Sequence, residues 1–175
     1  MSKRQEDAAK GIDKRGWVID LLNRQGGDFL KAQFARQEYF KKGEAPEYLG
    51  QAIIAYSIQN PLSSIIIELR LEQDSTRFQP SFFKGSRELS TNLDVIKSRY
   101  FLLMWSGRFS IIPGKWIVEN PKDFRVKQSK SKSNLTRMDI DFSNYLPEIP
   151  LNGGGLFDKR NLAQRIFDII RGEEE

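Results

Sequence analysis

The strongest constraint on the fold is a short apolar run, residues 65–71 (IIIELRL), that carries one acid and one base. Residues of this β-favouring type, preceded by the turn-forming residues 60–64 (NPLSS), predict a strand. The two-residue period of a strand places Glu68, Arg70 and Glu72 on one face. Charged groups on a central strand are costly unless they are paired, hydrogen-bonded or used to bind a metal or an anion. Glu68 and Arg70 are therefore candidate site residues, although an ordinary exposed face of an antiparallel sheet would give the same pattern.

The length of 175 residues fits one domain with a substantial core. We expect a single domain over 1–175, with a helical N-terminal part at 1–60, a sheet core at 61–145 and a C-terminal helix at 156–171. No run approaches the roughly 20 apolar residues that cross a bilayer, and the charged first seven residues have no apolar core behind them. The sequence therefore predicts a cytoplasmic protein without a membrane partner.

Histidine and cysteine are both absent from the chain. Their absence excludes a Ser-His-Asp triad, a cysteine nucleophile and a zinc site of His and Cys ligands. The chemistry that remains open is carboxylates with a hard metal such as Mg²⁺, assisted by Lys, Arg or Tyr. For an enzyme, this composition favours metal-assisted phosphodiester chemistry.

The positive charge is concentrated in one part of the chain. Residues 97–137 hold ten basic and two acidic residues, a net charge of +8, so the remainder carries −3 of the total of +5. Such clustering indicates a polyanionic partner, although a solvated basic surface would give the same excess. The candidate nucleic-acid-binding residues are Lys84, Arg87, Lys97, Arg99, Lys127, Lys130, Lys132 and Arg137.

Apolar spacing near 3.6 residues predicts a helix over 5–24, which Gln25-Gly26-Gly27 would end. Asp28 is a candidate N-cap for a second helix over 28–43. Residues 47–58 could form a short helix or a strand. A short helix is expected over 89–100, and the continuous apolar residues 100–105 predict a strand buried on both faces.

Two turns after this strand predict a meander of strands at 108–112 and 115–118, followed by a corner at 121–124. Residues 127–134 (KQSKSKSN) are basic and lack an apolar anchor, so we expect a loop that is mobile when unbound. Residues 138–142 alternate like an edge strand. Glycines 153–155 could form a hinge or cradle a phosphate, and Asp158 is expected to cap the last helix.

In this order, the elements are similar to those of the restriction-endonuclease-like superfamily, the PD-(D/E)XK nucleases. The similarity is closest over 60–124: residues 67–70 (IELR) resemble the family's Glu-x-Lys strand, and residues 93–105 resemble its helix-strand step. The resemblance implies an α/β (α+β) fold with a central mixed β-sheet flanked by helices, a Mg²⁺ site, and double-stranded DNA as the substrate.

The resemblance assigns roles to particular residues. Glu68 would bind the metal, Asn60 would complete its coordination shell, and Arg70 would hold the scissile phosphate. Two positions depart from the family pattern. Arg70 replaces a lysine and is a poor proton acceptor, and Asn60 stands near the expected position of the family's aspartate. Glu47 and Asp28 are further acidic candidates, with less suitable spacing.

Three functions follow as hypotheses. The first is a Mg²⁺-dependent endodeoxyribonuclease of the restriction type, acting as a homodimer. The second is a catalytically inactive nucleic-acid-binding subunit of a larger DNA-processing or defence assembly, which the substitutions at Arg70 and Asn60 favour. The third is an interaction module whose basic face is incidental.

Overall fold

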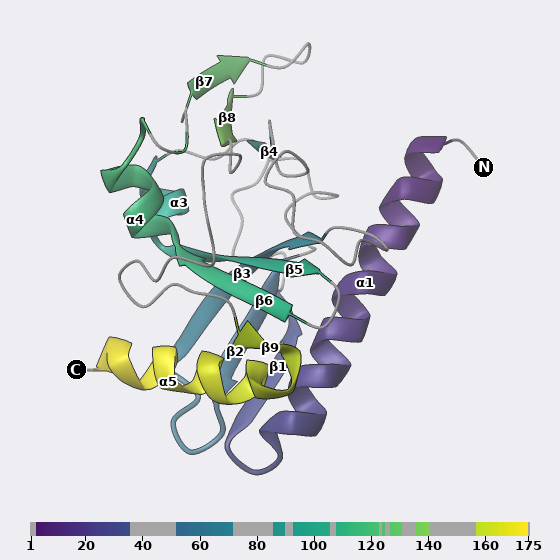
Figure 1. The fold of residues 1–175 in the computed structure, drawn as a ribbon, viewed down its shortest axis with the longest axis vertical. Coiled ribbons are helices and arrows are strands. Elements are labelled where there is room, and N and C mark those ends of the chain that lie inside the picture. Colours follow the sequence, from purple (N-terminus) through teal and green to yellow (C-terminus); the bar gives the residue numbers. More distant parts are fainter. Residues whose placement is uncertain are drawn as a thin grey trace.

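A six-stranded mixed sheet forms the body of the protein. The computed structural model describes residues 3–35, 52–71, 86–89, 93–105, 108–122, 124, 127–130, 136–140 and 157–174. The sheet has the order β1-β2-β3-β5-β6-β9, in which β3 and β5 are parallel and the other described neighbours are antiparallel. Its strands are β1 (Leu30–Phe34), β2 (Ile53–Ser57), β3 (Ser64–Leu71), β5 (Arg99–Trp105), β6 (Arg108–Pro113) and β9 (Phe157–Asp158). The expected mixed sheet with flanking helices is confirmed at this level (Figure 1).

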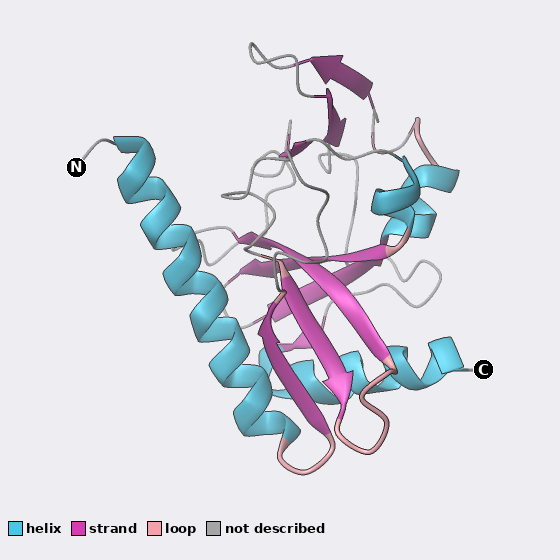
Figure 2. Cartoon of the chain, turned by 180° about the vertical axis from the view of Figure 1, so that it is seen from behind, coloured by secondary structure: helices cyan, strands magenta, loops and turns pink. Residues whose placement is uncertain are grey.

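Two helices pack against one face of this sheet (Figure 2). They are α1 (Lys3–Gly26) and α5 (Leu162–Glu174), the latter preceded by the 3-10 turn η3 (Lys159–Asn161). Val18 and Leu22 of α1 and Ile166 of α5 are fully buried in the main core with alternate residues of the strands. Helix α1 ends where expected, because Gly27 adopts a left-handed φ of 49°.

Two amide side chains in the last turns of α1 join it to other elements. Asn23 donates to the carbonyl of Ala32 at 3.1 Å and accepts from the N–H of Ala32 at 2.8 Å, so it satisfies both outward-facing groups of this β1 residue. Gln25 donates to the carbonyl of Lys159 and accepts from the N–H of Ala163 near the start of α5. The hydrogen bonds of Asn23 replace those that a neighbouring strand would make with the edge strand β1. Gln25 satisfies the backbone N–H of Ala163, which has no partner within α5 because it lies at the start of that helix.

Two short helices, α3 (Leu93–Lys97) and α4 (Gly114–Glu119), pack together and against β5 and β6. Their contact is close at Gly114, where an added Cβ would fall almost on the carbonyl oxygen of Ile96 and 2.7 Å from that of Arg99. Ile96, Ile117 and Phe124 are each no more than 1% exposed. Glycine at 114 therefore lets α4 approach the backbone that leads into β5.

A separate three-stranded antiparallel sheet has the order β4-β8-β7 and lies apart from the main sheet in Figure 1. Its strands are β4 (Ser86–Leu89), β7 (Lys127–Lys130) and β8 (Thr136–Ile140). The register sets Arg87, Asp139 and Lys127 in one cross-strand row, and Leu89, Arg137 and Ser129 in another.

Several predicted elements are confirmed. The helix over 5–24 is α1, the run 65–71 lies in β3, and the apolar run 100–105 lies in β5, where residues 101–104 are all buried. Asp158 caps the C-terminal helical segment, since its carboxylate accepts from the N–H of Arg160 at 2.8 Å. The nearby Arg160 guanidinium also holds the pKa of Asp158 below its usual value.

Other predictions are wrong. The expected second helix from Asp28 is instead strand β1, where Leu30 and Ala32 are buried and Lys31 and Gln33 are exposed. The helical N-terminal part at 1–60 therefore contains two strands, since β2 also lies within it. The expected strand at 115–118 is helix α4, and the first half of the expected basic loop at 127–134 is strand β7.

Some expectations fall on parts of the chain outside the described residues, including residues 36–51, Glu72, residues 131–134 and glycines 153–155. None of the helices that the structure describes is long and apolar enough to cross a membrane.

Candidate functional site

Glu68 lies on β3 and forms a buried ion pair with Arg99 at the start of β5. The Nη1 atom of Arg99 donates to Oε1 of Glu68. The Arg99 side chain is 5% exposed and the Glu68 side chain is 8% exposed. The parallel register pairs Glu68 with Phe101, and Arg99 lies two residues before Phe101 on the same face of the sheet. The buried cationic partner of Glu68 is thus on the neighbouring strand, 31 residues away in sequence.

A second guanidinium acts on the same carboxylate. Arg15, in the middle of α1, is half-buried, and desolvation lowers its pKa while the charge of Glu68 acts in the opposite direction. The charges of two arginines from different elements therefore act on Glu68. A neutralised, buried carboxylate of this kind has little capacity left to attract a hard cation.

Asn60 lies at the other end of β3. It belongs to the turn between β2 and β3, where its side chain donates to Ser63 Oγ at 2.9 Å and its backbone N–H donates to Ser57 Oγ at 3.3 Å. Glu68 is four residues beyond Ser64, the first residue of β3, which corresponds to about 13 Å of extended strand. The structure does not bring Asn60 and Glu68 within reach of one metal ion.

The donor set around Glu68 does not fit Mg²⁺. Among the described residues no three acidic side chains gather in one place, and the group that contacts the Glu68 carboxylate is cationic. Mg²⁺ binds through carboxylates and other oxygen ligands. We therefore derive no catalytic step through a metal at this position.

The candidate nucleic-acid-binding residues fall into separate groups. Lys97 is exposed at the end of α3, whereas Arg99 is buried in the ion pair. The remaining described candidates lie on the small sheet: Arg87 on β4, Lys127 and Lys130 on β7, and Arg137 on β8. Lys84 and Lys132 lie outside the described residues.

The pleat of the small sheet divides the positions of its charged residues between two faces. Residues directly opposite one another, and residues two apart along a strand, lie on the same face. One face thus holds the positions of Arg87, Lys127, Arg137 and Asp139, and the other face holds those of Glu88 and Lys130. Basic residues outnumber acidic ones at the positions of the first face and equal them at those of the second.

Sequence reasoning missed Arg15 and the pairing role of Arg99. A basic residue at the first position of an apolar strand, such as Arg99, is a weak indication of a buried ion pair. It becomes informative only once β5 is known to lie beside β3. Nothing in the local sequence around Arg15 distinguishes it from the other basic residues of α1. Arg70 lies opposite Leu103 in the parallel register, and its predicted phosphate-binding role stays a prediction.

No protein-family model matches the chain, and neither a curated protein nor a solved structure shows significant similarity to it.

Proposed function

We propose that the protein binds nucleic acid, with double-stranded DNA as the expected ligand, and that Glu68 stabilises Arg99 instead of binding a catalytic metal. The observation that carries the proposal is the register of the small sheet, which puts the positions of Arg87, Lys127 and Arg137 on the face that also holds the position of Asp139. Basic residues that share one face of a small sheet suit contacts with the phosphates of a polynucleotide.

The position of this part of the chain supports a polynucleotide ligand. Strands β7 and β8 pair within the three-stranded sheet β4-β8-β7, which lies at a distance from the main sheet (Figure 1). Residues 97–137, which include β7 and extend into β8, carry a net charge of +8, whereas the rest of the chain carries −3.

The ion pair between Glu68 and Arg99 supports the part of the proposal that concerns catalysis. A metal-binding carboxylate needs its charge available, whereas Glu68 is buried and accepts a hydrogen bond from a guanidinium. The role that we propose is therefore that of a binding subunit of a larger DNA-processing assembly. The mixed sheet on which the protein is built is of the kind that the restriction-endonuclease resemblance implies.

A metal-dependent endodeoxyribonuclease is the second candidate. The parallel pairing of β3 with β5 favours it, because a strand that carries Glu-x-Arg lies beside an apolar strand that follows a short helix, in the order implied by the resemblance. Cleavage would then require a rearrangement that frees Glu68 from Arg99.

One assay separates the two candidates. The purified chain is incubated with supercoiled plasmid, with and without Mg²⁺ or Mn²⁺. The proposal expects retarded migration without nicking in every condition, and metal-dependent nicking that is lost in Glu68→Gln would contradict it.

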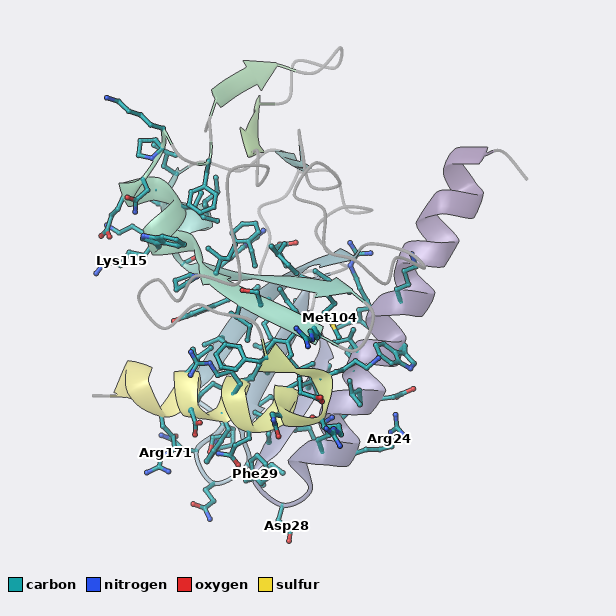
Figure 3. The ribbon with its side chains drawn as sticks, viewed as in Figure 1. Arg24, Asp28, Phe29, Met104, Lys115 and Arg171 are labelled. Carbon is teal, nitrogen blue, oxygen red and sulfur yellow. The ribbon has the colours of Figure 1, made fainter. Side chains whose placement is uncertain are left out.

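A pair of charge-reversal variants tests the small sheet. Lys127→Glu combined with Arg137→Glu should weaken binding to all DNA sequences and reduce the log-log salt slope by about 1.8, since each lost phosphate contact removes about 0.9. The matched control is Arg24→Glu with Arg171→Glu, which changes the charge equally at exposed positions near the ends of α1 and α5 (Figure 3). Equal losses in the two variants would show that the small sheet has no special role.

A further inference from the structure

We infer that the surface where α1, β9 and η3 meet binds single-stranded nucleic acid, with Trp17 stacking on an unpaired base and Lys159 and Arg160 contacting the flanking phosphates. This inference goes beyond the proposed function, because it adds an unpaired strand as a ligand. The surface is also a different one, since β9 lies away from the small sheet (Figure 1).

Contacts between side chains bring this surface together from distant parts of the sequence. The Nζ atom of Lys159 lies 4.8 Å from the centroid of the Trp17 ring, and the side chain of Gln25, also on α1, donates to the Lys159 carbonyl at 3.1 Å. Immediately before η3, Asp158 lies opposite Arg108 in the antiparallel pairing of β9 with β6. The surface therefore follows the last strand of the main sheet, from Trp17 of α1 to the first residue of β6.

The guanidinium of Arg160 is held in place on this surface. Its Nε and Nη2 atoms donate to the two oxygens of the Asp158 carboxylate at 3.0 and 3.2 Å, and its side chain is 88% exposed. Neither bond uses Nη1, so the planar group can still donate to a phosphate oxygen. Because Asp158 already orders this side chain, less conformational entropy is lost when a ligand binds.

The segments that meet here carry more positive than negative charge. Residues 157–161 of β9 and η3, with the opposite residue of β6, hold three basic residues and one acidic residue, namely Arg108, Lys159, Arg160 and Asp158. One turn on either side of Trp17, Lys14 and Asp20 add one charge of each sign. The excess of positive charge suits the phosphates of a polynucleotide.

Trp17 provides an aromatic ring at the same place. It is 43% exposed, although its neighbour Val18 is fully buried in the core. Covering this large apolar ring with a base removes it from water. The ammonium that lies over the ring belongs to the flexible stem of Lys159, so it can move from the ring to a phosphate beside the stacked base.

This combination of side chains favours a single strand over a duplex. Aromatic rings beside cations bind unpaired nucleotides, since every base offers a π-face, whereas a duplex covers those faces within its base stack. Such binding depends little on sequence. A deoxythymidine oligomer is therefore a suitable probe.

The first test uses Trp17 as its own reporter. The chain has three tryptophans, so the variant Trp105→Phe with Trp116→Phe leaves Trp17 as the only one. Titration with a labelled deoxythymidine oligomer of about 12 nucleotides, within the usual range of single-strand sites, should quench the Trp17 fluorescence to a saturating value. Binding of the label without a change in Trp17 emission, or no binding at low salt, would overturn the inference.

Single substitutions in the parent chain repeat the test without the double variant. Trp17→Ala should weaken binding of the oligomer by about 5- to 150-fold, the share of one stacked base, whereas Leu62→Ala, which removes an apolar side chain from a 94% exposed position, should not. Arg160→Gln should reduce the log-log salt slope by about 0.7, the share of one phosphate contact on a single strand. The control Arg171→Gln removes an exposed cation near the other end of α5 and should leave the slope unchanged (Figure 3). Equal effects in the test and control variants would overturn the inference.

Two further ligands separate this inference from the proposed function. Duplex DNA of the same length should still bind Trp17→Ala and should lose affinity for Lys127→Glu with Arg137→Glu. If the oligomer binds through Trp17 and no duplex binds, this inference stands and the duplex ligand of the proposed function fails. If the duplex binds and the oligomer shows no dependence on Trp17, the proposed function stands and this inference fails. Polyglutamate that quenches Trp17 as strongly as the oligomer would overturn the inference in favour of an acidic protein partner.

Discussion

Glu68→Gln should destabilise the protein strongly, because it removes the negative charge that Arg99 contacts in a buried ion pair. The two side chains are only 5% and 8% exposed, for Arg99 and Glu68, so solvent can do little to replace the lost charge. Breaking such a pair costs about 3–5 kcal/mol. For a domain of this size, 1 kcal/mol corresponds to about 2–4 °C, so we expect a fall in Tm of roughly 6–20 °C. Thermal melting followed by circular dichroism measures the change.

The matched control is Glu119→Gln. Glu119 makes the same type of pair with Lys115 at 3.9 Å, but both side chains are more than half exposed, and exposed pairs contribute about 0–1 kcal/mol. A double variant, Glu68→Leu with Arg99→Met, removes both buried charges and should recover most of the lost stability. If Glu68→Gln melts like Glu119→Gln, the account of a buried, structural Glu68 is refuted.

Two further substitutions test the packing. Gly114→Ala should lower the free energy of unfolding in urea by more than about 3 kcal/mol, because its Cβ would overlap backbone oxygens. The control Gly16→Ala, with nothing within 4 Å of its Cβ, should raise that free energy by up to about 1 kcal/mol. Equal effects of the two substitutions would contradict the close approach of α4. Asn23→Ala should cost about 1–3 kcal/mol for each of the two Ala32 backbone groups that it leaves unsatisfied, and an unfolding free energy equal to that of the parent would show that Asn23 does not protect the edge strand.

The sequence predicts the elements whose pattern is local and strong. The run 65–71 and the apolar residues 100–105 become β3 and β5 because their composition suits buried strands and turns flank them. The helix over 5–24 follows from the spacing of Trp17, Val18 and Leu21 and from a glycine stop. These elements also suffice to predict a mixed sheet with flanking helices.

The errors arise where the surroundings decide the structure. Phe29, Leu30 and Phe34 have a spacing that suits a helix, but alternate burial beside β2 and the amide of Asn23 select a strand. Residues 115–118 suit a strand by composition, yet they form helix α4. Gly114, the first residue of α4, permits the close contact between this helix and the backbone of α3.

The candidate site could be predicted only in part. The pattern of 65–71 indicated that Glu68 needs a partner, and the nearest base on the same face in sequence is Arg70. The partner in the structure is Arg99, which is 31 residues from Glu68 in sequence. Their contact depends on the parallel register of β3 and β5, and a local sequence pattern does not encode that register. The contribution of Arg15 depends on the path of α1 across the sheet.

The salt dependence of binding to a labelled DNA duplex tests the central claim most directly. If about four to six phosphates are contacted, the logarithm of the association constant should fall linearly with the logarithm of the salt concentration, with a slope of roughly −3.6 to −5.4. This slope should be the same for unrelated duplex sequences, because phosphates carry no sequence information. A slope near zero, or no binding at low salt, would contradict the proposal that this protein holds nucleic acid through its basic residues.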